Sequence, residues 1–236
     1  MSLVVPPDTF YLVAEEFLLM EWRSTNAAVV KSSIQSYFHW IQEQSFPWVR
    51  DCIPSRHRLG VQMNLLVFHS VFRHTNIQKY WEELLFKADI VYKQQASKTH
   101  LIPVCYDVSL AQDIEVVARI SKVEIDYVIQ LHCSVEYEVS MMGFLPGFAY
   151  MDGLPAPMHV PRLLKPRREV PAGSVAIAGS STAIYPVASP GGWRIIGRTP
   201  LSMLTDDIKS PTRFSVGDRV RFTSIDLQEW NDFMHQ

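Results

Sequence analysis

Apolar positions in the first 90 residues follow the periods of strands and helices in turn. Alternating or continuous apolar runs predict short strands at 10–13, 17–22 and 59–63, the last extended through residue 68. Apolar residues at helical spacing predict an amphipathic helix that starts after a cap at Thr25 and ends at Phe46, and a second over 77–89 that is capped by Thr75 or Asn76. Residues 1–95 are therefore expected to form an α+β N-terminal sandwich domain, with a sheet on one side and two helices on the other.

The pattern changes after a polar stretch at Lys93 to Lys98, which we interpret as a linker. A strand over 101–106 is expected next, followed by a helix over 113–120 and a second helix whose capping box is Ser121 with Glu124. Beyond residue 135, short apolar runs separated by Gly and Pro predict strands at 137–141, 174–178, 183–187, 193–196 and 219–223. Residues 96–236 are therefore expected to form a mainly β barrel or sandwich domain.

The composition is that of an ordinary globular protein. The chain has 236 residues, 47% of them hydrophobic, and its formal net charge of −2 gives no reason to expect nucleic acid or a membrane surface as a partner. Cys52, Cys105 and Cys133 fit neither a disulfide framework nor a zinc site, so reduced cysteines and a cytoplasmic location are expected. No signal-peptide pattern is visible, and no apolar stretch approaches the roughly 20 residues that span a bilayer.

Three blocks between residues 143 and 200 are unusually rich in glycine, proline and aromatic residues. They read GFLPGFAY from Gly143, VPAGSVAIAG from Val170, and YPVASPGGWRIIGRTP from Tyr185. Glycine reaches backbone angles that are closed to other residues, and proline fixes its own angle and removes an amide donor. Such blocks specify a defined loop surface, and we expect the functional site there.

These blocks resemble those of the family formed by the B subunits of 5-oxoprolinase. Leu131 and His132, the IPVCYD segment from Ile102 and the VGDRVRF segment from Val216 carry the same resemblance. This family also contains the histidine kinase inhibitor KipI, and it is similar to the first carboxyltransferase half of urea carboxylase and to allophanate hydrolase relatives. The resemblance implies a cyclophilin-like barrel for residues 96–236.

The resemblance also implies a function. The chain would be one member of an ATP-dependent 5-oxoprolinase complex, which opens 5-oxo-L-proline to L-glutamate together with homologues of the A and C subunits, with ATP bound by this chain or by a partner. One alternative is a KipI-like inhibitor that binds a sensor histidine kinase. Another is an allophanate hydrolase-like or urea carboxylase-like protein that acts on a different small amide.

His132 is the candidate catalytic residue. It lies at the end of a predicted helix that leads into the GFLPGFAY block, so its imidazole is a candidate general acid or base near neutral pH. A histidine in a last helical turn also interacts favourably with the helix dipole, and its position alone favours this structural role. The resemblance brings the two interpretations level, because the family motif carries a histidine here.

Further positions are candidates for substrate binding, because glycine-rich backbone offers amide donors, arginine pairs with carboxylate or phosphate, and aromatic faces stack on planar ligands. Each has a structural alternative: an aromatic corner of the barrel, a solvated basic edge, a turn that enters a strand, or a core position. The candidates are Gly143, Phe144, Pro146, Gly147, Arg162, Arg167, Ser174, Tyr185 and Trp193.

Two groups of motifs are missing. The sequence has no GxxxxGK[ST] or GxGxxG pattern for nucleotide phosphates, and no set of metal ligands with convincing spacing. The chain also departs from the family pattern at residues 107–111 and 181–183, where donors or flexible backbone are replaced. These departures leave the identity of the substrate open, and with it the activity.

Overall fold

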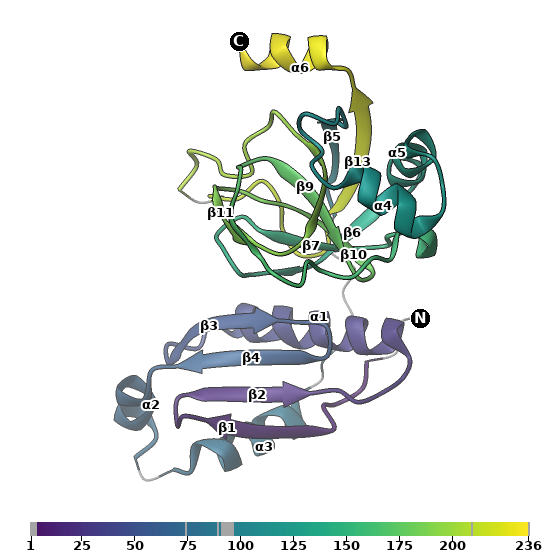
Figure 1. Cartoon of the computed structure of the whole chain (residues 1–236). Helices are drawn as coiled ribbons and strands as arrows, with labels where there is room; N and C mark the ends of the chain where they lie inside the picture. The colour runs from purple at the N-terminus through teal and green to yellow at the C-terminus, as the bar shows by residue number, and fades with distance from the viewer. Residues whose placement is uncertain (1–3, 74, 89, 91–96, 209, 236) are drawn as a thin grey trace. The chain divides into compact units, whose positions relative to one another are not determined.

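The computed structural model describes residues 4–73, 75–88, 90, 97–208 and 210–235. The chain divides into two compact units, Met1–Gln95 and Ala96–Gln236 (Figure 1). Each unit has its own hydrophobic core. The linker predicted at Lys93 to Lys98 lies largely outside the described residues.

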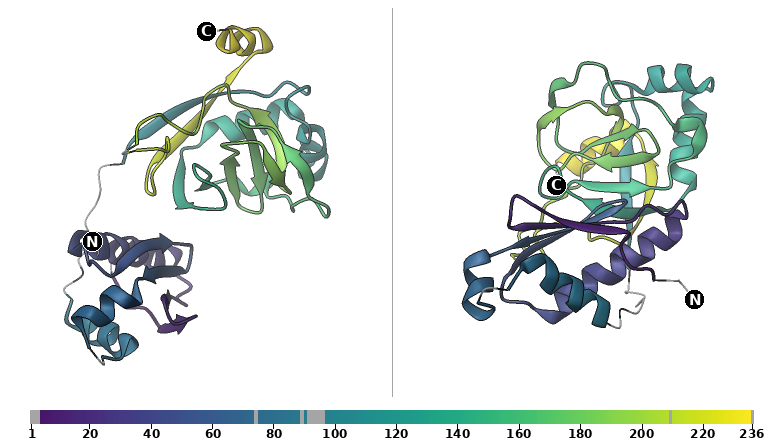
Figure 2. Two further views of the ribbon diagram at one scale, coloured as in Figure 1. Left: turned by 90° about the vertical axis from the view of Figure 1, so that its left-hand side faces the viewer. Right: turned by 90° about the horizontal axis from the view of Figure 1, so that it is seen from below.

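The first unit is a four-stranded antiparallel sheet in the order β1-β2-β4-β3, with helices α1 and α3 on one face (Figures 1 and 2). Alternate residues of the two central strands, such as Leu18 and Met20 in β2 and Leu59 and Val61 in β4, are buried against these helices in one core. The elements are β1 (Thr9–Val13), β2 (Phe17–Glu21), α1 (Ala27–Gln44), β3 (Val49–Pro54), β4 (Arg58–Met63), α2 (Leu65–Val71) and α3 (Ile77–Lys87).

Three asparagines set where the helices of this unit begin. The side chains of Asn26, Asn64 and Asn76 each accept a hydrogen bond from a backbone N–H in the first turn that follows. The cap predicted at Thr25 is therefore wrong by one residue, whereas the prediction of Asn76 is confirmed. The predicted extension of the β4 strand through residue 68 is also wrong, because Asn64 starts helix α2 directly after the strand ends.

The second unit contains a closed barrel of seven strands in the order β10-β7-β6-β13-β5-β12-β9, which confirms the predicted barrel (Figure 1). Strand β13 runs parallel to β5 from the Arg219–Thr99 pair to the Ile225–Cys105 pair, and the other neighbours are antiparallel. The barrel strands are β5 (Thr99–Cys105), β6 (Tyr137–Met142), β7 (Ala149–Asp152), β9 (Ser174–Ala178), β10 (Ser181–Ile184), β12 (Arg194–Arg198) and β13 (Arg219–Ile225).

Helices and one short ribbon complete this unit. Helices α4 and α5 pack against the barrel, and α6 follows β13 (Figure 1). Strands β8 and β11 pair as a separate two-stranded sheet. The capping box predicted at Ser121 and Glu124 is wrong, because Ser121 ends α4 and the Glu124 side chain makes no cap hydrogen bond. The remaining elements are α4 (Ile114–Ser121), α5 (Ile125–Ser134), β8 (Arg167–Val170), β11 (Ser189–Gly191) and α6 (Leu227–Met234).

Gly173 forms the turn that leads into β9 and needs the absence of a side chain. Its φ is +78°, and a Cβ at this position would collide with the carbonyl oxygen of Thr199. The same backbone is tied down on both sides: the Gly173 N–H donates to the Tyr185 carbonyl (2.8 Å), and the Thr199 N–H donates to the Gly173 carbonyl (2.9 Å). The backbone around residue 173 therefore cannot easily shift to make room for a methyl group.

We expect Gly173→Ala to destabilise the second unit more than Gly217→Ala does. Both glycines have positive φ, at +78° and +92°, but a Cβ at Gly217 would meet open space. Both variants should lose about 1 kcal/mol from backbone strain, and Gly173→Ala should lose a further 1–3 kcal/mol or so from the collision with backbone. Urea unfolding of the full chain measures both free energies, and equal losses would contradict this account of the turn.

Candidate binding pocket

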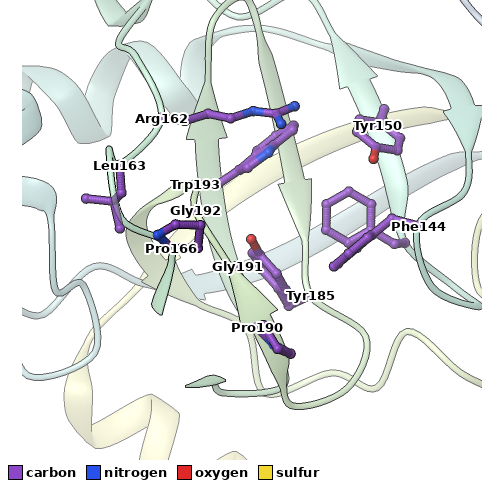
Figure 3. Close-up of a pocket in the computed structure, with 11 residues that line it drawn as sticks. Phe144, Tyr150, Arg162, Leu163, Pro166, Tyr185, Pro190, Gly191, Gly192 and Trp193 are labelled. Atoms are coloured by element: carbon purple, nitrogen blue, oxygen red, sulfur yellow. The ribbon is translucent and has the colours of Figure 1, made fainter. Parts of the chain in front are cut away.

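The second unit contains a pocket of about 270 Å³ where the first and third sequence blocks meet (Figure 3). Five aromatic residues line it, together with two prolines, two glycines, one leucine and one arginine. Its lining residues are Phe144, Phe148, Tyr150, Arg162, Leu163, Pro166, Tyr185, Pro190, Gly191, Gly192 and Trp193.

Phe148 is the hub of the aromatic wall. Its ring makes edge-to-face contacts with Tyr150, Tyr185 and Trp193, at centroid distances of 4.9, 5.3 and 5.8 Å. Tyr150 comes from β7, Tyr185 follows β10, and Trp193 precedes β12, so three barrel strands bring the rings together. Edge-to-face pairs of this kind add to the stabilisation from burial, so the wall is held as one packed group.

Gly191 permits the close approach of Tyr185. A Cβ at residue 191 would lie 2.7 Å from Cζ and 2.8 Å from Cε1 of the Tyr185 ring, and closer still to the phenol oxygen. The ring therefore lies directly over the backbone of β11. Any side chain other than hydrogen at this position would displace it.

Both phenols of the pocket stay protonated at neutral pH. Burial raises the pKa of Tyr185 above its ordinary value, although a hydrogen bond from the Trp193 backbone N–H and the positive charge of Arg162 act in the opposite direction. Burial likewise raises the pKa of Tyr150, against the same Arg162 charge. A protonated phenol can donate a hydrogen bond to a ligand carbonyl.

Arg162 is the charged residue of the lining. Its guanidinium lies 5.7 Å from the centroid of the Trp193 ring, as a cation–π contact (Figure 3). The Leu163 N–H donates to the Gly192 carbonyl (2.7 Å), which ties this segment to the turn before β12. No carboxylate within the described ranges forms an ion pair with Arg162, so its guanidinium is available to an anionic ligand.

Arg167 is placed differently from Arg162. Its Nη2 lies 2.8 Å from Oδ1 of Asp113, which is buried at the start of α4, and Arg167 is not part of the pocket lining. Of the predicted substrate-binding residues, the pocket thus brings together Phe144, Arg162, Tyr185 and Trp193.

The other predicted positions lie outside the lining and support the fold around it. The Gly143 N–H donates to the Phe148 carbonyl (3.1 Å), and Gly147 turns with φ of +82° against Leu204. Pro146 is exposed between them, and Ser174 is buried at the start of β9. The structure gives none of these four a place in the pocket wall.

His132 is fully buried and lies apart from the pocket. Its Nε2 is 3.1 Å from Oγ1 of Thr182, and its Nδ1 is 2.7 Å from the Tyr106 phenol oxygen. Thr182 donates its own hydroxyl to the Ala176 carbonyl (3.2 Å), so it accepts from Nε2–H, and Nδ1 accepts from Tyr106.

Burial also lowers the pKa of the His132 imidazole to about 3, so the ring is neutral at physiological pH. Stacked on Phe222 at 4.4 Å, it has the contacts of a structural core residue. The role in proton transfer stays a prediction that these contacts do not support. A charged interaction with the helix dipole is also unsupported, since that interaction needs the protonated ring.

The sequence predicts the right blocks but misses several lining residues. Phe148 and Tyr150 belong to the GFLPGFAY block, for which core packing and ligand binding stay equally open from the sequence, and neither is among the candidate residues. Leu163, Pro166, Pro190, Gly191 and Gly192 are not among them either. Phe148 and Tyr150 are two residues apart at the start of a strand, where side chains two apart point to the same face. This spacing is a weak signal that both rings belong to one wall. No local signal points to Asp113, which meets Arg167 from 54 residues away.

Other classes of site find no support within the described ranges. No group of three or more His, Cys, Asp or Glu side chains there is arranged to hold a metal ion. None of the helices described is both long and apolar enough to cross a bilayer. The three cysteines are free thiols.

Known proteins resemble this chain in sequence and in fold. The family model described as carboxyltransferase domain, subdomain C and D, matches residues 9–214. The B subunit of 5-oxoprolinase from Bacillus subtilis (strain 168) is 34% identical over 207 residues, which cover 84% of each chain. Its counterpart from Escherichia coli O157:H7 is 38% identical over 176 residues, or 75% of this chain and 78% of the relative.

Among solved structures, the urea carboxylase of Kluyveromyces lactis is similar in fold. It aligns with a TM-score of 0.75 at 16% identity, over 98% of this chain and 23% of that chain. At this identity the likeness shows the fold alone.

We expect the buried His132 to make the second unit sensitive to acid. Unfolding returns the imidazole to its ordinary pKa of 6.5, so protonation favours the unfolded chain. The contribution of neutral His132 is complete above about pH 6.5 and is lost as the pH falls toward 3, with a slope of about 1.4 kcal/mol per pH unit. His132→Gln should remove this part of the slope and lower the free energy of unfolding at neutral pH.

Urea unfolding at several values between about pH 7 and about pH 4 tests this expectation. The control is His159→Gln, because His159 is exposed and contacts only the Leu154 carbonyl (2.9 Å) among the side-chain hydrogen bonds described in this unit. The control should keep the wild-type slope. An unchanged slope in His132→Gln would show that His132 does not carry the acid sensitivity.

Proposed function

The chain belongs to the carboxyltransferase-domain family that contains the B subunits of 5-oxoprolinase, and we propose on this basis that it is the B subunit of an ATP-dependent 5-oxoprolinase. The complex would hydrolyse 5-oxo-L-proline to L-glutamate in the cytoplasm, and its other members would be homologues of the A and C subunits. The observation that carries this proposal is the aromatic pocket of the second unit, whose lining holds one guanidinium, Arg162, without a carboxylate partner in the described part of the chain.

The chemistry of 5-oxoproline suits this pocket. The molecule is a small lactam ring with a flat amide group and one carboxylate. Arg162 would pair with the carboxylate through two parallel hydrogen bonds, and the faces of Trp193 and Tyr185 would pack on the ring. Tyr150, which keeps its phenol proton, would donate to the lactam carbonyl. A pocket of about 270 Å³ is at the small end of ligand sites, as a substrate of this size requires.

The lining supplies binding rather than proton transfer. Hydrolysis of the lactam adds water across the carbon–nitrogen bond, so a base must take a proton from water and an acid must give one to the leaving nitrogen. The pocket lining contains neither a carboxylate nor a histidine, and its phenols stay protonated at neutral pH. The proposed task of this chain is therefore to hold and orient the substrate, while partner subunits provide the groups that move protons.

The pocket does not fit ATP. A nucleoside triphosphate carries several negative charges, whereas the lining offers one cation, and the sequence lacks the glycine-rich loop that cradles phosphates. We propose that a partner subunit binds ATP. The pocket of this chain would then bind only the amide substrate.

Reconstitution tests the proposed function. The purified chain alone should release no phosphate from ATP in a 5-oxoproline-dependent manner, and release should appear when homologues of the A and C subunits are added. Turnover by the isolated chain would overturn the role as one member of a complex. Turnover of a different amide by the complex would overturn the substrate, and inhibition of a sensor histidine kinase without any amide hydrolysis would favour the KipI-like alternative.

We expect Arg162→Gln to weaken binding of 5-oxoproline by tenfold or more, because a charge-assisted hydrogen bond contributes about 1.5–3 kcal/mol. The free energy of unfolding should stay within about 0.5 kcal/mol of wild type, since the side chain is exposed. Calorimetric titration of the assembled complex gives the affinity. The matched control is Arg168→Gln, an exposed arginine nearby that does not line the pocket. Equal losses of affinity in both variants would reject the role of Arg162.

A further inference from the structure

A buried cluster of charges lies beside the pocket and centres on Asp113. Oδ1 of Asp113 is 2.8 Å from Nη2 of Arg167 and 3.8 Å from Nη1 of Arg194, and Oδ2 accepts the Ile195 N–H at 2.7 Å. Asp113 itself is 4% exposed. A buried carboxylate with this set of partners is held in one place, next to both guanidinium groups.

Arg167 is the member of the cluster that is next to the pocket wall. In the β8–β11 ribbon it is paired with Gly191, and its neighbour in sequence is Pro166, and both of these line the pocket. Its positive charge also acts on the pKa of the Tyr185 phenol, another lining group. Nη1 of Arg167 is buried and has no hydrogen-bond partner within the described ranges. The backbone of Arg167 is therefore next to the wall, while its guanidinium is paired with Asp113.

Arg194 follows the lining residue Trp193 and makes a separate contact. Its Nε donates to the carbonyl of Pro161 at 3.4 Å, and it is absent from the pocket lining. Of the two arginines beside Asp113, Arg167 is the one with a buried N–H that has no hydrogen-bond partner in the described part of the chain. Arg162, without a carboxylate partner among the described residues, remains the cation that a ligand meets directly.

We propose that Asp113 is a specificity-determining residue, which makes the pocket select singly charged anions because it keeps the Arg167 guanidinium occupied. Two free guanidinium groups at one small pocket would favour a ligand with two negative charges, whereas one favours a monoanion. The inference rests on the proposed function only in taking this pocket as the substrate site. The new element is that Asp113, which does not contact the substrate, determines which substrate charge the pocket prefers.

Two simple anions measure this selectivity without the natural substrate. Cyclopentanecarboxylate carries one carboxylate on a ring, and glutarate carries two on a short chain. Titration calorimetry of the 236-residue chain gives a dissociation constant for each. Wild type should bind cyclopentanecarboxylate more tightly. Asp113→Asn should shift the ratio of the two constants toward glutarate by about tenfold, the effect of one additional charge-assisted hydrogen bond.

Two further variants separate this effect from a general change of charge or structure. Glu115→Gln removes a negative charge from the first turn of the same helix, but Glu115 is exposed, so the ratio should stay as in wild type. In the double variant Asp113→Asn with Arg167→Gln, the gain for glutarate should disappear, because the released guanidinium is gone. A merely structural role of Asp113 would weaken both anions and would not produce a gain for either.

Each outcome decides between the possibilities. An unchanged ratio in Asp113→Asn, or a gain that persists in the double variant, overturns the proposal. Should Asp113→Asn fail to fold, Arg167→Gln alone is decisive. Its dissociation constant for cyclopentanecarboxylate should be within about threefold of the wild-type value. A tenfold loss of affinity would show that Arg167 already binds the anion directly.

The result also stands apart from the proposed function. If 5-oxoproline does not bind but the ratio shifts as expected, the substrate is wrong and the selection by charge holds. If 5-oxoproline binds and the ratio does not shift, the selection by charge alone is rejected. Binding of neither probe by wild type would overturn the selection by charge, and the proposed function would still be decided by binding and turnover of 5-oxoproline in the complex.

Discussion

The contact between the Tyr185 ring and the backbone of Gly191 is the constraint on which the pocket depends. Tyr185 is 1% exposed, and it leans on Phe148, which in turn contacts Tyr150 and Trp193. Because a Cβ at residue 191 would meet the ring well within contact distance, the position of all four rings follows from the absence of one side chain. The ribbon that carries Gly191 also carries Arg167, so one short element contributes both to the aromatic wall and to the ion pair with Asp113.

Much of the fold follows from local patterns in the sequence. The alternation of Leu18 and Met20, and the helical spacing of α1, report one buried face each, and both elements were predicted. The run after Asn64 was misjudged because a short apolar segment fits a strand and a helix equally well. Strands β8 and β11 are too short to show a hydrophobic period. The parallel pairing of β13 with β5 was not predictable either, because the local sequence of a strand does not indicate which strand it pairs with.

The candidate site was predictable as a region and less so as a set of residues. Glycine, proline and aromatic content located the loops, but it could not distinguish Arg162 from Arg167, each of which follows a proline. What separates them is Asp113, a tertiary contact from another part of the chain. His132 shows the same limit, because Tyr106 and Thr182, which bind its two ring nitrogens, are distant in sequence. A residue's type suggests its chemistry, whereas its burial decides whether that chemistry is accessible.

The position of β13 between β5 and β6 has a consequence for how the protein is made. The Lys98 N–H bonds to the Asp218 carboxylate 120 residues later, at the point where β13 joins β5. The first unit has all its strands within residues 9–63 and can assemble while the rest of the chain is still being synthesised. The barrel, by contrast, stays open until residue 225 has left the ribosome, and until then β5 and β6 present unpaired strand edges. Closure of the barrel by its last strand therefore removes the strand edges that could pair with other chains.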